Sequence, residues 1–242
     1  MKKILSFSLF CALIVSLLVS PSYSQDAKTI LDRIIDAQGG RKLLESIKDS
    51  TSIADMELPE MGMSGTGTMY SKEPNKMRLD LDIMGMVIIQ ASDGETSWEY
   101  NSQIGVSEAH TGNLESVMIN SSFGNSAFLE PEKYGISYEV KGKETVDGKE
   151  YLLLERIYPD KYSITIYIDP ETYLIYKFRQ DSYDEMQMEI LEETVFSDYK
   201  IIDGIMTAFS LKILRDGGEF AVLTITDVKF NTGLDDSFFI MN

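Results

Sequence analysis

Four Asp-Gly pairs, each flanked by residues typical of β-strands, constrain the fold of this chain more than any other feature of its sequence. Asp-Gly favours the type I′ turn of a β-hairpin, because both central residues of that turn need a positive φ angle. Asp169-Pro170-Glu171-Thr172 adds a fifth turn. Hairpins join antiparallel neighbours, so the chain after residue 50 is predicted to form a sheet of about nine to twelve strands that curls or closes. The four pairs are Asp93-Gly94, Asp147-Gly148, Asp203-Gly204 and Asp216-Gly217.

Two helices are predicted before the strands. Asp26 is a suitable N-cap, and apolar residues follow it at helical spacing until Gly39-Gly40 ends the pattern. A second, shorter amphipathic segment covers residues 41–47. A third segment, 112–125, lacks the alternation of a strand and is expected to form a short helix or a mobile loop. The apolar side chains of the first two helices include Ile30, Leu31, Ile34, Ile35, Leu43 and Leu44.

Alternation within the strands predicts which side chains face the interior. In residues 76–83 apolar side chains alternate with charged ones, so Arg78, Asp80 and Asp82 should point away from the apolar set. The same period of two groups Trp98 with Tyr100, and it groups three isoleucines of residues 163–168. The predicted interior residues are Met77, Leu79, Leu81, Ile83, Trp98, Tyr100, Ile164, Ile166 and Ile168.

These apolar faces need a cover, and the helical pair at the N-terminus, helped by the segment 112–125, is the cover that the sequence offers. One short pair of helices is too small to fill a trough of about ten strands. Either strand side chains fill the middle, or a hydrophobic cavity remains. The 13 methionines favour a cavity, because methionine repacks around guests of variable shape. Met61-Gly62-Met63 and Met84-Gly85-Met86 are each expected to place two methionines on one face.

The first 24 residues have the pattern of a secretory signal peptide. Lys2 and Lys3 precede an apolar stretch, and Ser22-Tyr23-Ser24 offers small residues for cleavage after Ser24. An uncleaved membrane anchor is the alternative. Cys11 lies inside the apolar stretch and not at the cleavage point, which argues against a lipid-modified N-terminus. Residues 25–242 are then predicted to form one exported domain.

Charge and composition exclude several classes of function. The formal net charge is −17 at pH 7, and removal of Lys2 and Lys3 makes it more negative, so the chain should repel nucleic acids and anionic membranes. The sequence has no phosphate loop, zinc pattern, nucleophile elbow or dinucleotide fingerprint, and it predicts no catalytic residue, metal site or cofactor. A hydrolase that uses two carboxylates is the enzymatic alternative. Its candidate pairs, which chance alone explains among 39 acidic residues, are Asp80 with Asp82, Glu192-Glu193 and Asp235-Asp236.

Several local motifs occur in an order that resembles a known family. Gly39-Gly40-Arg41-Lys42-Leu43 follows the first helix, and the turn at residues 168–174 comes later in the chain. The runs 196–205, 227–231 and 234–239 complete the set. Together they resemble the periplasmic outer-membrane lipoprotein-sorting family, the LolA-like proteins of Gram-negative bacteria.

This resemblance implies an unclosed antiparallel β-barrel, with the N-terminal helices forming a lid over a hydrophobic cavity. It also implies a periplasmic carrier or chaperone, acting as a monomer, that binds the acyl chains of a lipid or lipoprotein. An inner-membrane donor and an outer-membrane acceptor would be its protein partners, and no covalent chemistry would be involved. An envelope scaffold that binds a protein through an exposed strand edge is the alternative function for such a fold.

Overall fold

The structure, a computed structural model, describes residues 26–184 and 187–241, so the predicted signal peptide lies outside the described residues. The described strands form one antiparallel sheet of 13 strands, slightly more than the number predicted. The strands are β1 (Asp49–Leu58), β2 (Met63–Lys72), β3 (Lys76–Ile83), β4 (Met86–Ser92), β5 (Ser97–Asn101), β6 (Val106–Ala109), β7 (Ser137–Val146), β8 (Lys149–Ile157), β9 (Ser163–Ile168), β10 (Ile175–Tyr183), β11 (Glu189–Ile202), β12 (Ile205–Arg215) and β13 (Gly218–Phe230).

The sheet consists of two meanders that meet at a single strand pair. Strands β1 to β6 follow one another, strands β7 to β13 do the same, and β1 pairs with β13. The register runs from Ser50 opposite Phe230 to Glu57 opposite Val222. The strands β6 and β7 stand at the two ends of the sheet, and within the described residues they do not pair with each other. The predicted unclosed antiparallel barrel is therefore confirmed.

Three of the four Asp-Gly pairs form the predicted hairpin turns, with positive φ at both residues. In Asp203-Gly204, for example, φ is 51° and 86°. The pair at Asp93-Gly94 is different, because only the glycine has positive φ. There the Asp93 amide donates to the Thr96 carbonyl oxygen at 3.2 Å, so a wider loop connects β4 to β5.

The helices begin close to the positions that the sequence indicates. Asp26 caps α1 by accepting a hydrogen bond from the Thr29 amide at 2.7 Å. The segment 112–125 contains a helix, α3, and a short helix follows it. The helical segments are α1 (Ala27–Ala37), α2 (Arg41–Ser46), α3 (Gly112–Ser121), α4 (Ser126–Leu129), and the 3₁₀ turns η1 (Pro59–Met61), η2 (Pro131–Tyr134) and η3 (Asp236–Phe239).

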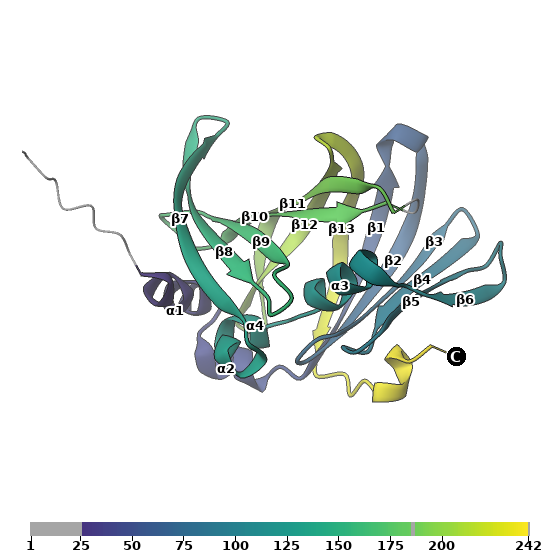
Figure 1. Ribbon diagram of the computed structural model, residues 1–242, viewed down its shortest axis with the longest axis horizontal. Helices are drawn as coiled ribbons and strands as arrows, with labels where there is room; N and C mark the ends of the chain where they lie inside the picture. Colours follow the sequence, from purple (N-terminus) through teal and green to yellow (C-terminus); the bar gives the residue numbers. More distant parts are fainter. Residues whose placement is uncertain (1–25, 185–186, 242) are drawn as a thin grey trace, which may run out of the picture.

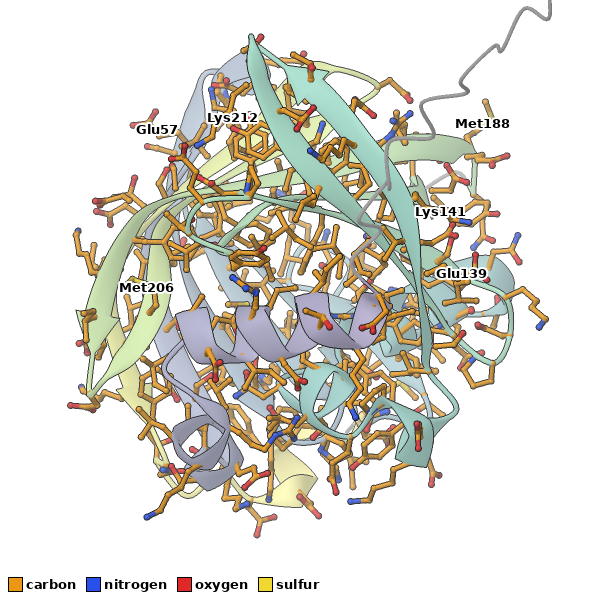
Figure 2. The ribbon with its side chains drawn as sticks, turned by 90° about the vertical axis from the view of Figure 1, so that its left-hand side faces the viewer. Glu57, Glu139, Lys141, Met188, Met206 and Lys212 are labelled. Atoms are coloured by element: carbon orange, nitrogen blue, oxygen red, sulfur yellow. The ribbon has the colours of Figure 1, made fainter. Side chains whose placement is uncertain are left out.

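The turn between α1 and α2 is fixed against the hairpin of β11 and β12. Gly39 has a φ of +129°, and a Cβ atom at this position would lie 2.7 Å from the Gly204 carbonyl oxygen. The amide of Met206, a residue labelled in Figure 2, donates to the Gln38 carbonyl oxygen at 3.0 Å. Glycine at position 39 therefore permits a backbone approach that a side chain would block.

The helices occupy one part of the curved sheet. In Figure 1, α1, α2 and α4 gather beside β7 to β9, and α3 lies between the two arms of the sheet. Figure 2, turned by 90°, shows α1 crossing in front of the strands. Within residues 26–184 and 187–241, no helix combines the length and the apolar content that crossing a bilayer requires.

Candidate functional site

One continuous face of the sheet, called here the inner face, carries most of the apolar strand residues. Residues directly opposite each other in an antiparallel ladder point to the same side, as do residues two apart on one strand. This rule connects Ile166 on β9 to Ile83 on β3 through all the strands that lie between them. The connecting pairs are Ile166–Phe178, Phe178–Thr194, Thr194–Ile213, Ile213–Ala221, Leu223–Met56, Met56–Gly65 and Gly65–Ile83.

The inner face of β8 to β10 is covered by helices, and we call it the covered half. Ile164, Ile166 and Ile168 are at most 2% exposed, and they share one buried cluster with side chains of α1, α2 and α4. All six apolar helix residues predicted to cover the sheet belong to this cluster, five of them buried and Leu43 partly buried: Ile30, Leu31, Ile34, Ile35, Leu43 and Leu44.

The packing of the covered half corrects one prediction. Ile164, Ile166 and Ile168 were expected to line a cavity, but helix side chains fill the space next to them. Removing each isoleucine from water contributes about 1.5–3 kcal/mol, so this packing stabilises the closed arrangement. A ligand reaches these residues only if the helices move away.

Helix α3 contacts β4 and β5. On the inner face of β1 to β4, β12 and β13, the hydrophobic cluster around Ile83 contains no helix side chain within the described residues, and we call this region the open half. Here Met77, Leu79 and Leu81 are half-buried, and only Ile83 among the predicted residues of β3 is buried. The hydrophobic cluster around Ile83 consists of strand residues alone within the described chain. Its partly buried members on β2, β3, β4, β12 and β13 include Met63, Leu81, Met86, Ile88, Ile213 and Leu223.

Trp98 and Tyr100 lie on the opposite face, which corrects their predicted place in the interior. Trp98 pairs with Ala91, and Ala91 pairs with Arg78, whose neighbour Leu79 faces inward. The C-terminal turn η3 covers this outer face. The indole Nε1 of Trp98 donates to the Phe239 carbonyl oxygen at 2.8 Å, and the Arg78 guanidinium lies 4.3 Å from the centre of the Phe238 ring.

The two methionine pairs do not each place both methionines on one face, as the sequence predicted. Gly62 and Gly85 have φ angles of +61° and +88°, so each stands in a hairpin turn and not within a strand. Met61 and Met84 are therefore exposed at the hairpin tips. Met63 and Met86 alone pack with the apolar cluster of the open half.

Two of the pockets formed by the described residues are lined by none of the nine predicted interior residues. The first, of about 190 Å³, lies where β1 and β2 meet the connection between α3 and α4. The second, of about 260 Å³, lies between α3 and Asp160. Met77, Leu79 and Leu81 are only half-buried, so this part of the open half is in contact with solvent.

The acidic pairs considered for catalysis all make structural contacts. Asp80 accepts from the Arg78 guanidinium at 2.7 Å on the outer face, as the alternation predicts. Glu193 forms an ion pair with Lys177 at 2.6 Å, and its neighbour Glu192 lies 3.4 Å from Arg215. The remaining carboxylates accept from the Gly85 amide, from the Ser237 amide and from the Lys72 ammonium; these are Asp82, Asp235 and Asp236.

Sequence reasoning missed a buried arginine on the inner face of β8. Arg156 is 2% exposed, its Nε donates to the Tyr138 hydroxyl at 2.8 Å, and its Nη1 donates to the Tyr158 hydroxyl at 3.2 Å. Its Cζ lies 4.3 Å from the centre of the Phe128 ring of α4. Burial raises the pKa of Tyr138 to about 12, so this hydroxyl is neutral at pH 7. The alternation of β8 could have placed Arg156 on the inner face, because this residue follows the inward-facing Leu152 and Leu154 at a spacing of two.

The open sheet and the helices on one half of it define a LolA-like fold, and solved structures agree. A LolA superfamily protein from Nitrosomonas europaea shares 15% identity, with a TM-score of 0.58 over 89% of this chain and 97% of that chain. A domain from Vibrio parahaemolyticus, provisionally assigned to outer membrane lipoprotein sorting, shares 17% identity, with a TM-score of 0.57 over 88% and 95%. A DUF1329 family protein from Desulfovibrio piger shares 19% identity, with a TM-score of 0.56 over 88% and 96%. The resemblance seen in the sequence is thus confirmed for the fold.

The chain belongs to a protein family whose model, described as "-like: Uncharacterized protein", matches residues 81–242. This match covers the end of β3, all later strands and the C-terminal turn η3. No curated protein matches the sequence.

Proposed function

We propose that this protein is a periplasmic carrier that binds acyl chains of a lipid or lipoprotein against the inner face of its sheet. The observation that carries the proposal is the open half, where Met77, Leu79 and Leu81 remain half-buried beside a cluster built from strands alone. Soluble proteins rarely leave continuous apolar surfaces uncovered unless those surfaces bind something. Residues 25–242 act in this proposal as one carrier domain, exported by the segment 1–24.

Hydrocarbon burial supplies enough binding energy for such a carrier without a catalytic residue. Each CH₂ group removed from water contributes about 0.8 kcal/mol, so about ten of them contribute about 8 kcal/mol. Methionine side chains suit this task because they adapt to chains of different length. Met63, Met77 and Met86 supply such side chains on the open half.

In this proposal α1, α2 and α4 form a lid that moves to let acyl chains reach the covered half. Polar contacts join the lid helices to one another and to the turn between β2 and β3. The Arg41 Nη1 of α2 donates to the Leu129 carbonyl oxygen of α4 at 3.0 Å. The Glu73 carboxylate accepts from the Asn125 and Ser126 amides, at 2.7 and 3.0 Å, and so holds the start of α4.

A carrier of this kind needs a donor and an acceptor. The description of the Vibrio parahaemolyticus domain favours a lipoprotein among the amphiphiles that the surface suits, with an inner-membrane donor and an outer-membrane acceptor as partners. The net charge of −17 supports a monomer that stays free of anionic membranes between these encounters.

Scaffolding through a strand edge is less well supported. The edge strand β7 carries charged side chains, among them Glu139 and Lys141, which Figure 2 labels and which form an ion pair at 3.0 Å. The other edge strand, β6, has only four residues. Charges and short length are the features by which natural sheets prevent edge pairing.

A fluorescent fatty-acid probe tests the proposed function. Leu79→Glu is expected to weaken probe binding at least about tenfold, because it places a carboxylate on the apolar open half. Asp80→Asn is the matched control, since it changes the next residue of β3 on the outer face and should leave the affinity unchanged. Fluorescence titration of the purified variants measures both. An equal loss of affinity in the two variants would contradict the assignment of the inner face.

A further inference from the structure

Arg156 carries a positive charge that no carboxylate balances. Its two hydrogen bonds go to tyrosine hydroxyls, and no ion pair joins it to a carboxylate of the described residues. Its Nη2 atom is buried and has no hydrogen-bond partner. Buried charges in proteins are normally paired, and an orphaned charged group costs several kcal/mol. A group with this cost calls for an explanation in terms of function.

A second tyrosine, Tyr162, lies next to Tyr158. Tyr162 stands in the turn between β8 and β9, and its buried hydroxyl lies next to the side chain of Ser121 at the end of α3. Its ring centre lies 5.8 Å from that of Tyr158, the residue that accepts from Arg156. Burial raises the pKa of Tyr162, so its hydroxyl keeps its proton at pH 7 and remains a donor. The unpaired charged donor in this region is therefore the Nη2 atom of Arg156.

Aromatic side chains lead from Arg156 to the open half of the inner face. The Arg156 Cζ lies 5.9 Å from the centre of the Phe178 ring, which contacts Phe196 edge-on at 5.0 Å. Phe196 pairs with Leu211, and Leu211 pairs with Leu223, a member of the open-half cluster. An amphiphile with its head at Arg156 can therefore lay its chain along the inner face.

We propose that Arg156 binds a singly charged anionic headgroup, a carboxylate or phosphodiester, of the amphiphile that the inner face carries. The inference rests on the proposed function and names the class of its ligand. One guanidinium beside the hydroxyls of Tyr138 and Tyr158 offers one positive charge, which a monoanion neutralises. Phe128 of α4 covers the guanidinium, so the headgroup enters when α4 moves. The headgroup then replaces the cation–π contact with a charge-assisted hydrogen bond.

Competition of single-chain amphiphiles against a fluorescent alkyl probe tests this assignment. Wild-type protein should bind laurate at least about tenfold more tightly than lauryl alcohol, and lauryl trimethylammonium least tightly. Arg156→Met should remove the preference by weakening laurate alone, and Arg156→Lys should keep part of it. A parallel titration with lysophosphatidylglycerol shows which of the two monoanionic headgroups binds more tightly.

The outcomes separate the two proposals. Equal binding of laurate and lauryl alcohol by the wild-type protein overturns the headgroup site and leaves the carrier function standing. Binding of neither amphiphile overturns both.

Thermal unfolding distinguishes a ligand-binding arginine from a structural one. Arg156→Met should leave Tm unchanged or raise it, because it removes an unpaired buried charge. The matched control is Lys177→Met, which leaves Glu193 without its partner at 2.6 Å and should lower Tm by several degrees. If Arg156→Met lowers Tm as much as Lys177→Met does, the arginine is structural and the headgroup site is wrong.

Discussion

Replacing Ile166 by alanine is expected to lower the free energy of unfolding by about 3–5 kcal/mol, whereas Leu79→Ala should cost about 1 kcal/mol or less. Ile166 is fully buried among residues of the covered half, so its removal leaves a cavity that the packed helices and strands cannot close. Leu79 is half-buried on the open half, where water already contacts the side chain. Alanine there loses some apolar contact and creates no cavity.

Urea unfolding of both variants measures this difference. The midpoint of Ile166→Ala should fall well below that of the wild type, with an unchanged slope, and the midpoint of Leu79→Ala should stay close to it. Similar losses in the two variants would mean that the two halves of the inner face are packed equally. The division into a covered and an open half would then be wrong.

Asp49→Ala is expected to cost about 3 kcal/mol of stability, because it removes the acceptor for several backbone amides at once. The Asp49 carboxylate is buried at the start of β1. It accepts from the Thr232 amide at 2.5 Å, the Thr232 hydroxyl at 2.8 Å and the Gly233 amide at 3.1 Å. These contacts fix the chain after β13 and so place η3 over Trp98.

Asp235→Ala is the matched control for this prediction. Asp235 lies in the same C-terminal segment and caps η3 by accepting from the Ser237 amide at 2.9 Å, but it is exposed. Its replacement should cost about 1 kcal/mol, as loss of an exposed cap does. Calorimetry or urea unfolding compares the two. If both substitutions cost the same, the amides of Thr232 and Gly233 do not depend on Asp49.

Local patterns predicted much of the fold because their causes are local. Asp26 caps α1, Gly39 ends it, and three Asp-Gly pairs form hairpins, since each outcome depends on a few neighbouring residues. The alternation of residues 76–83 also holds, with Leu79 on the inner face and Asp80 on the outer one. Asp93-Gly94 departs from the rule because the Asp93 side chain accepts from the Thr96 amide and favours a wider loop.

The remaining features depend on contacts between distant segments, which alternation does not encode. Alternation groups Trp98 with Tyr100, but only the register of β5 against β4 decides which face they take. The cover over that face comes from Phe239, far along the chain. The burial of Arg156 likewise depends on Phe128 of α4 and on Tyr138 of β7.

Photoaffinity labelling tests most directly the central claim that the inner face binds acyl chains. The probe is a palmitate analogue with a diazirine in its chain, cross-linked to the purified wild-type protein and mapped by mass spectrometry. We expect labels on inner-face residues of β3, β12 and β13, among them Leu79, Ile213 and Leu223, and competition by unlabelled palmitate. Labelling confined to outer-face residues or exposed loops, or labelling that palmitate does not reduce, would contradict the claim.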